Sequence, residues 1–386
     1  MGCKELDHLF IIGGSILLVF FFISFIFQKL KLPPLLAYIF LGVALSGLFT
    51  EPELEIIDQV ARIGIVLLFF LLGLHFPLNR LMNISRRIWQ AGILDVLLSF
   101  GGGVLLALLF GFDLLTSLIV GGVAYASSSS ITVKLLEESN RMNTPEGEYK
   151  LALLIFEDLV APVMVSFLVG ISIQGSITGQ ALAVISAKVI LMTVASVLIA
   201  YYGFRKLDLF VKRYAAKDFM LLLAVSIAFI FAGIAVYLDL SKLLGAFLAG
   251  VMLSETGTSR ELERLVLPIK DLSLPFFFFW FGTSIILGRG LAAPALLILL
   301  VAWAFVGKII VGYWGGRLYG LTVKGSLRAA FSLGQRGEFS VVIATLGDAD
   351  LRVFLGIYIV ATAIGGVYLF RQAPHMAERL ARFRKG

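Results

Sequence analysis

Apolar residues fill thirteen runs along this chain, and short polar connectors separate the runs. The runs lie near residues 8–28, 33–49, 57–77, 88–110, 114–136, 149–173, 179–203, 218–238, 242–254, 265–286, 291–315, 325–346 and 351–371. A straight helical crossing of a bilayer needs about 20 residues, and several runs reach that length. Because lipid offers no partner to an unpaired backbone group, runs of this kind predict helices. The pattern predicts an all-α integral membrane protein with about thirteen transmembrane helices.

The charges of the connectors predict how the helices are oriented. Basic residues concentrate in alternate connectors and in the tail, namely Lys29, Lys31, Arg80, Arg86, Arg87, Lys134, Arg141, Lys150, Arg205, Lys206, Lys212, Arg213, Lys217, Arg260, Arg264, Lys270, Arg317, Lys324, Arg328, Arg371, Arg379, Arg382, Arg384 and Lys385. The intervening connectors hold few, and the one over 51–58 is acidic. Basic connectors face the cytoplasm as a rule. We therefore expect a cell-membrane protein with its N-terminus outside and its tail, 372–386, in the cytoplasm.

The composition agrees with this interpretation and removes several other classes. The chain is 59% hydrophobic and 15% charged, whereas soluble domains average about 25% charged residues. The net charge of +7 lies in the connectors rather than on one surface, so nucleic acid is not the expected partner. Cys3 is the only cysteine, which excludes an intrachain disulfide and a cysteine metal site. No nucleophile–base constellation or phosphate loop is present, so we expect neither an enzyme nor a cofactor.

Thirteen spans divide into six, one and six. This division predicts a single transporter domain over residues 1–386, with repeat one over 8–173, a linker helix over 179–203 and repeat two over 218–371. Six helices followed by a linker would make the second repeat enter the membrane from the opposite side. Inverted repeats of this kind are typical of secondary transporters.

Two corresponding spans carry interruptions at matching places. Span five contains Ser127 to Ser130, four serines that compete for backbone hydrogen bonds. Span twelve contains Gly334 to Glu338, including Gln335 and Arg336, and its glycines weaken a helix. Paired interruptions predict two broken helices that cross near the midplane and leave partial charges there.

Simpler explanations exist for both interruptions. Serine and glycine clusters can be close-packing surfaces between membrane helices. Arg336 and Glu338 could neutralise each other or compensate the dipoles of the half-helices without any contact to a substrate. We favour the role in dipole compensation.

Ionisable side chains at membrane depth are the candidate chemistry. Glu157 and Asp158 lie side by side within the apolar stretch 151–170. A charged residue at the centre of a membrane helix costs about 2.5–3.5 kcal/mol on insertion scales. Lys308 in span eleven is too deep to reach the surface easily, and pairing with Asp158 or Glu157 would offset the cost of both charges. For Asp95 in span four we favour a structural role.

A buried carboxylate site can hold a proton or a monovalent cation by mutual exclusion. Burial and a like-charged neighbour favour the proton, and a bound cation displaces it. Competition at one site that opens alternately to each side couples two opposed fluxes. We therefore predict a shared cation and proton site at Asp158 and Glu157, with the hydroxyls of Ser128, Ser129 and Thr132 as further candidate ligands.

Several motifs resemble one known family. They are FEDLVAP around Glu157, ASSSSITVK over 126–134, LGAFLAGVMLSET over 244–256, PIKDLSLPFFFFWFGTSI over 268–285 and GQRGEFSVV over 334–342. In this order and over nearly the whole chain, they are similar to the membrane domain of Kef-type monovalent cation:proton antiporters. The resemblance implies a sodium/proton antiporter-like fold of thirteen spans, a homodimer, and a mobile core of spans four to six and eleven to thirteen.

The resemblance also implies that Asp158 is the essential ion-binding carboxylate and that Lys308 matches the lysine of span eleven. Two departures matter for the function. Relatives often carry glutamine, aspartate or asparagine at the position of Glu157, which leaves potassium and sodium both open as substrates. The chain also ends before a nucleotide-binding regulatory domain could begin, so regulation by nucleotide or glutathione is not expected.

Two other transport functions fit parts of the pattern. A cation channel could use the broken helices as its gate, and it would conduct without saturating. A solute symporter could use the same inverted-repeat scaffold, and it would accumulate solute without opposite proton flow. The paired acidic residues at depth favour an antiporter over both.

Overall fold

A computed structural model describes residues 3–76, 86–174, 177–200, 202, 217–285 and 293–383 of the chain. Its helices and π-helical segments are α1 (Cys3–Lys29), α2 (Pro34–Leu45), α3 (Glu51–Leu74), α5 (Arg86–Asp95), η1 (Val96–Gly101), α6 (Gly102–Leu109), α7 (Leu114–Tyr125), α8 (Ser129–Glu138), α9 (Pro145–Gln174), α10 (Gly179–Ile199), α12 (Lys217–Tyr237), α13 (Lys242–Ser254), α14 (Ser259–Thr283), α15 (Pro294–Ile310), η4 (Val311–Gly315), α16 (Gly316–Tyr319), α17 (Val323–Ala330), α18 (Glu338–Ala344) and α19 (Ala349–Phe383).

The prediction of an all-α membrane protein is confirmed. Within the described ranges, eight helices are long and apolar enough to cross a bilayer, and four shorter apolar helices accompany them. The run predicted at 114–136 divides into α7 and α8, and the run at 325–346 divides into α17 and α18. The exact number of thirteen crossings stays a prediction.

Some connector residues used for the orientation lie outside the described part of the chain. The described part does not include Arg80, Arg205, Lys206, Lys212, Arg213, Arg384 and Lys385. For Arg86, Arg87, Lys217 and Arg382 it includes the backbone but not the side chain.

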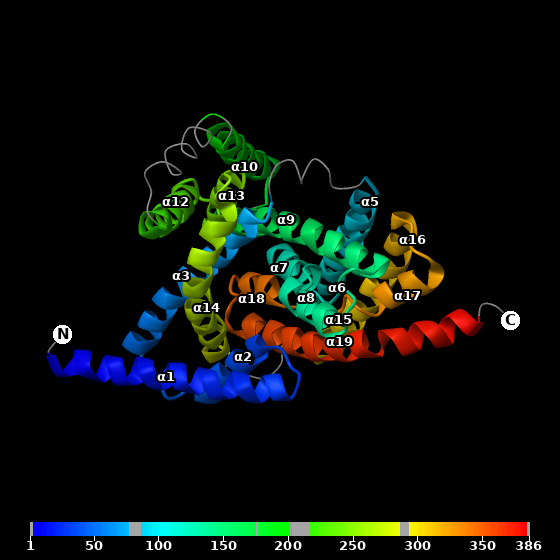
Figure 1. Ribbon diagram of the computed structural model, residues 1–386, viewed down its shortest axis with the longest axis horizontal. Coiled ribbons are helices and arrows are strands. Elements are labelled where there is room, and N and C mark those ends of the chain that lie inside the picture. The colour runs from blue at the N-terminus through cyan, green and yellow to red at the C-terminus, as the bar shows by residue number, and fades with distance from the viewer. Residues whose placement is uncertain are drawn as a thin grey trace.

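The helices pack in two groups (Figure 1). One group contains α1, α2, α3, α12, α13 and α14, with α14 and α13 lying against α3 and α14 also against α2. The other contains α5 to α9 and α15 to α19, in which α17 packs on α19 and α18 on α7. The long helix α9 contacts members of both groups, including α13 and α17. The functional side chains discussed below belong to the second group.

Two close crossings hold the first group together. At the α3–α13 crossing, a Cβ on Gly73 would overlap the carbonyl oxygen of Phe247, and a Cβ on Gly250 would overlap that of Phe70. At the α2–α14 crossing, Gly42 and Gly282 meet the backbone of the opposite helix in the same reciprocal way. Small residues let membrane helices approach closely and gain van der Waals contact. In the predicted repeats α2 corresponds to α13 and α3 to α14, so the two crossings correspond to each other.

Two π-helical turns interrupt the spans that carry Asp95 and Lys308. The turn η1 follows Asp95 directly, and η4 begins three residues after Lys308. A carbonyl of each turn accepts a hydrogen bond from an aromatic side chain on another helix. Trp303 donates to Leu98 of η1 at 2.8 Å, and Tyr149 donates to Val311 of η4 at 3.0 Å. Such turns are rare and often mark functional sites, because they change the direction of side chains along a helix.

The outer faces of several helices are apolar and exposed. Phe21 on α1, Ile190 on α10 and Leu222 on α12 are more than 60% exposed. Large exposed apolar surfaces in a monomer mark contact with a partner or with lipid. In helices of this length, lipid is the natural environment for these side chains.

Candidate ion-binding site

Two broken helices cross at the centre of the second group. Helix α7 ends at Tyr125 and α8 begins at Ser129, while α17 ends at Ala330 and α18 begins at Glu338. The extended segments between them meet in an antiparallel bridge of Ser127 with Arg336, and the Ser128 amide donates to the Gln335 carbonyl at 2.9 Å. The bridge satisfies backbone groups that would otherwise lack partners in the membrane. The predicted interruptions at these two places therefore form one crossover.

Local sequence explains why the helices restart where they do. The Ser128 side chain accepts from the amide of Ile131 at 3.2 Å and so caps the N-terminus of α8. At the start of α18, a Cβ on Gly337 would overlap the side chain of Ser128, so the crossover needs glycine there. Within the run of four serines, Ser128 thus caps α8 and Ser127 forms the bridge at the crossing point.

Arg336 and Glu338 stand at opposite kinds of helix ends and do not pair with each other. The Arg336 guanidinium, fully buried, donates to the Tyr125 carbonyl at the C-terminus of α7 at 3.4 Å. Glu338 lies in the first turn of α18, and its carboxylate accepts from the hydroxyls of Ser128 at 2.9 Å and Ser130 at 2.5 Å. A cation at a helix C-terminus and an anion at an N-terminus both oppose the helix dipole. This geometry agrees with dipole compensation.

Gln335 and Thr132 connect the two broken helices a second time. The Gln335 amide nitrogen donates to the Thr132 hydroxyl at 2.5 Å and to the Ser332 carbonyl at 3.2 Å. The Gln335 side-chain oxygen is buried and accepts no hydrogen bond from the described residues. The contact places Thr132 against the crossover rather than against a carboxylate.

Lys308 joins two acidic side chains from different helices. Its ammonium lies 2.8 Å from the Asp95 carboxylate and 2.9 Å from that of Glu157, and all three side chains are fully buried. Ser99 donates to the other oxygen of Asp95 at 2.7 Å. A buried charge is tolerated when it is paired and hydrogen-bonded, and the two carboxylates supply both to Lys308.

Glu157 also reaches the crossover directly. Its second carboxylate oxygen accepts from the Ser127 amide at 2.5 Å, and the Ser127 hydroxyl lies 3.3 Å from the first. The carboxylate therefore links Lys308 on α15 to the broken span of α7 and α8. Both oxygens of Glu157 therefore already accept hydrogen bonds from Lys308 or Ser127.

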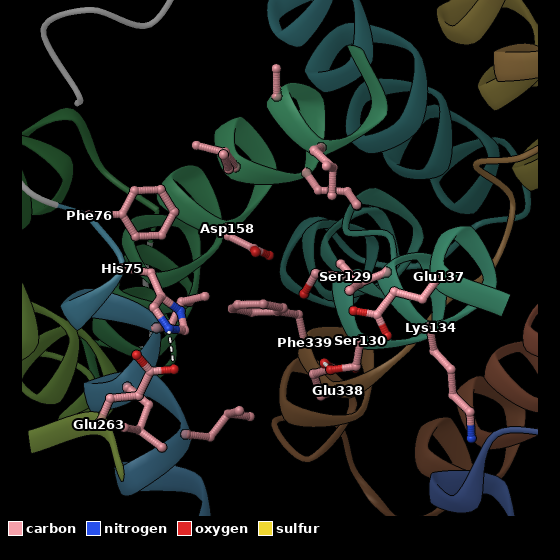
Figure 2. A pocket seen from close by; sticks show the side chains of 18 of the residues that line it. His75, Phe76, Ser129, Ser130, Lys134, Glu137, Asp158, Glu263, Glu338 and Phe339 are labelled. Atoms are coloured by element: carbon pink, nitrogen blue, oxygen red, sulfur yellow. Dashed lines mark hydrogen bonds and ion pairs between the residues drawn. The ribbon is translucent and has the colours of Figure 1, made fainter. Parts of the chain in front are cut away.

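Asp158 points the other way, into a cavity (Figure 2). Its side chain is 95% buried, yet its Oδ1 accepts no hydrogen bond within the described part of the chain. Ser129, the first residue of α8, interacts with the same carboxylate. Adjacent positions on a helix point about 100° apart, which explains why Glu157 meets Lys308 while Asp158 does not. Of the two partners that the sequence left open for Lys308, the structure therefore selects Glu157 and not Asp158.

The cavity beside Asp158 measures about 1050 Å³ and is lined by both groups of helices. Ser129, Ser130 and Glu338 line it near the crossover, and His75 and Glu263 line it further away, joined at 3.0 Å. Lys134, Glu137 and Lys270 are also among its lining residues. A hollow of this size gives a hydrated ion room to approach a buried carboxylate.

One member of the buried cluster was not among the predicted site residues. Asp95, assigned a structural role from the sequence, is the second anion that holds Lys308. The signal in the sequence was an acidic residue at membrane depth, which is costly and therefore functional as a rule. Asp95 and Lys308 are 213 positions apart in the sequence, so no local pattern predicts their contact.

Crossed broken helices around buried ionisable residues define a class of secondary cation transporters. The chain belongs to the sodium/hydrogen exchanger family: the family model for the transmembrane sodium/hydrogen exchanger matches residues 16–371. It is therefore a multi-pass membrane protein of the monovalent cation:proton antiporter class. The resemblance to cation:proton antiporters that the motifs indicated is confirmed.

Similar proteins cover nearly the whole chain. The ammonium/H(+) antiporter subunit AmhT of Alkalihalophilus pseudofirmus is 46% identical, over 95% of this chain and 94% of that protein. The K(+)/H(+) antiporter subunit KhtU of Bacillus subtilis is 30% identical, over 97% and 96%. The solved sodium proton antiporter MjNhaP1 of Methanocaldococcus jannaschii has a TM-score of 0.72 at 16% identity, over 97% and 99%, and shows the same fold.

Proposed function

We propose that this protein exchanges a monovalent cation for protons by alternating access at Asp158. The observation that carries the proposal is the contrast between two neighbouring carboxylates. Glu157 is held by Lys308 and Ser127, whereas Asp158 faces the cavity with an oxygen free to accept. An anion in that position is stabilised by whichever cation reaches it.

The residues around Asp158 support binding of a dehydrated cation. Ser129 interacts with its carboxylate, and Ser130, which lines the same cavity, donates its hydroxyl hydrogen to Glu338. A hydroxyl that donates to a carboxylate keeps its lone pairs for a cation. Hard monovalent cations prefer such oxygen ligands. Protonation of Asp158 removes its charge and releases the cation, so one site serves both ions in turn.

We propose potassium, sodium or ammonium as the cation. The similarity to AmhT, named as an ammonium/H(+) antiporter subunit, and to KhtU, named as a K(+)/H(+) antiporter subunit, supports ammonium and potassium. An ammonium ion can donate hydrogen bonds to the carboxylate and to hydroxyl oxygens, whereas a metal ion can only be coordinated by them. No catalytic chemistry is part of this function, so we propose that the protein is not an enzyme.

We further propose that the transporter domain consists of two inverted repeats, 8–173 and 218–371, with a linker over 179–203. Two structural pairs support this division. The α2–α14 and α3–α13 crossings use reciprocal glycines, and the π-helical turns η1 and η4 follow Asp95 and Lys308 in spans four and eleven. On this basis α5 to α9 and α15 to α19 form the moving core, and the remaining helices form a homodimer scaffold.

The proposed setting is the cell membrane, with the N-terminus outside and the C-terminus in the cytoplasm. The concentration of basic residues in alternate connectors supports this orientation. In that orientation the cavity beside Asp158 opens to the cytoplasm, since Lys134 and Lys270 line it.

Reconstituted vesicles test the function. An outward or inward gradient of potassium, sodium or ammonium should drive opposite proton movement, reported by a pH-sensitive dye inside the vesicles. Asp158→Asn should abolish the exchange at equal protein content, while Glu261→Gln on the scaffold helix α14 should leave it unchanged. Conductive flux that does not saturate would favour a channel instead, and solute accumulation without opposite proton flow would favour a symporter. Exchange that persists in Asp158→Asn would contradict the proposal.

A further inference from the structure

Three basic side chains gather at one end of the second group, away from the Asp158 cavity. Arg141 lies in the connector between α8 and α9, Lys150 in the first turns of α9, and Arg328 in α17. Arg141 and Arg328 approach the same oxygen of Glu146 at 3.6 Å and 3.3 Å. Lys150 and Arg141 lie over the ring of Phe370, at 4.7 Å and 5.3 Å from its centroid. We call these three residues the basic cluster.

Two members of the basic cluster are buried, the third is 29% exposed, and several of its donors lack acceptors. Lys150 is fully buried and Arg141 is 91% buried. The Lys150 ammonium, Nε and Nη2 of Arg141 and Nε of Arg328 have no hydrogen-bond acceptor in the described part of the chain. A buried polar group without a partner costs about 1–3 kcal/mol, and more when it is charged. Several such donors in one place call for an acceptor from outside the chain.

The neighbouring acids do not neutralise this charge. Among the described residues, Glu146 is the one carboxylate paired with Arg141, and it is shared with Arg328. Glu378 is 2.9 Å from Lys324 and 3.9 Å from Arg328, so it already serves another lysine. The face of Phe370 contributes only about 0.5–2 kcal/mol to a cation. Among the described residues, the basic cluster therefore has more basic groups than carboxylates in contact with it.

We propose that the basic cluster binds a phosphate group. Guanidinium groups match the oxygens of phosphate in pairs, and a lysine adds a point charge. The same chemistry is present in free inorganic phosphate and in the phosphodiester of a lipid headgroup. The residues that line the cavity beside Asp158 do not include the basic cluster, so this site is separate from the proposed transport site.

The location gives the site a structural consequence. The basic cluster connects the segment after α8, the start of α9 and helix α17. These elements carry both broken spans and the helix of Asp158. A phosphate bound among them would fasten the two halves of the proposed core at one end, as a brace distinct from Lys308.

Thermal unfolding of the purified protein tests the site. The protein is stripped of bound lipid in detergent and kept in phosphate-free buffer, and then inorganic phosphate or phosphatidylglycerol is added. A ligand well above its dissociation constant should raise the unfolding midpoint by about 2 °C or more. Lys150→Met removes the ammonium group, keeps an unbranched side chain and should abolish the rise. Lys188→Met, which removes a lysine of α10 that is paired with Asp239, should preserve it.

The two additions distinguish the source of the phosphate group. A rise with inorganic phosphate supports free phosphate, and a rise with phosphatidylglycerol alone supports the lipid headgroup. No rise with either, or an equal rise in Lys150→Met, would overturn the proposal. If Lys150→Met does not fold, Arg328→Gln serves as the second variant, with the same loss expected. None of these readouts depends on transport.

Discussion

The ammonium of Lys308 lies 2.8 Å from the carboxylate of Asp95, a residue 213 positions earlier in the chain. The two residues come from different halves of the sequence and precede the two π-helical turns. Together with Glu157 they form a fully buried chain of charges. These three charged side chains connect α5, α9 and α15 to one another, and through Ser127 they connect to the crossover.

The buried charge chain predicts strong coupling between Lys308 and Asp95. Lys308→Met should lower the free energy of unfolding by about 3–5 kcal/mol, because it leaves two buried carboxylates without a cation. Asp95→Asn in the same protein should recover part of this loss, since it removes one of those charges. Thermal or denaturant unfolding in detergent measures the cycle. Losses that add within about 0.5 kcal/mol would contradict the contact.

Glu157 and Asp158 should respond differently to neutralisation. Glu157→Gln keeps an oxygen that can accept from the Ser127 amide, and Lys308 keeps Asp95 as its partner. We expect exchange within about tenfold of the unmodified protein, a change of about 1.4 kcal/mol in the barrier. Asp158→Asn should show none. The vesicle assay at matched protein levels makes the comparison, and equal inactivity of both variants would place Glu157 in the cation site itself.

The crossover should be sensitive to a single methyl group. Gly337→Ala would place a Cβ against the side chain of Ser128, and overpacking of this kind costs about 1–3 kcal/mol. We expect lower stability and a reduced exchange rate. Gly233→Ala in α12 is the matched control, because a Cβ there meets no atom within 4 Å. Equal behaviour of the two variants in unfolding and transport would show that the crossover tolerates extra volume.

The cap of α7 should make stability depend on acid pH. Asp113 accepts from the Thr116 hydroxyl at 2.5 Å and from the Thr116 amide at 3.1 Å. These hydrogen bonds hold the pKa of Asp113 below its ordinary value. The charged cap therefore stabilises the fold at neutral pH, and its contribution is lost as the pH falls through that lowered pKa.

Two substitutions at this position separate the charge from the cap. Asp113→Ala should lower the free energy of unfolding by about 1 kcal/mol at neutral pH, and the difference should shrink in acid, where the protonated carboxyl caps without its charge. Asp113→Asn keeps a capping oxygen without a charge, so its cap should not depend on pH. Unfolding midpoints across the acid range measure both. A difference for Asp113→Ala that stays constant with pH would contradict the role of the ionised carboxylate.

Much of the architecture was predictable because the bilayer imposes simple rules on the sequence. Long apolar runs in lipid must be helices, because every backbone polar group needs a partner within its own segment. The interruptions at Ser127 and at Gly334 were visible, because serine and glycine runs weaken helices wherever they lie. Asp158 was identifiable as a candidate for a different reason, because a carboxylate within an apolar run is costly at membrane depth and can be seen in the sequence.

What the tertiary structure alone decided is which charged groups meet. Composition and spacing left Lys308 with two possible partners on span six and left Asp95 outside the site. The structure pairs Lys308 with Glu157 and Asp95, because their direction depends on helix rotation and on the π-helical turns, neither of which a linear pattern records. Asp158 therefore faces the cavity without a cation partner among the described residues, and that difference between adjacent carboxylates arises only from three-dimensional packing.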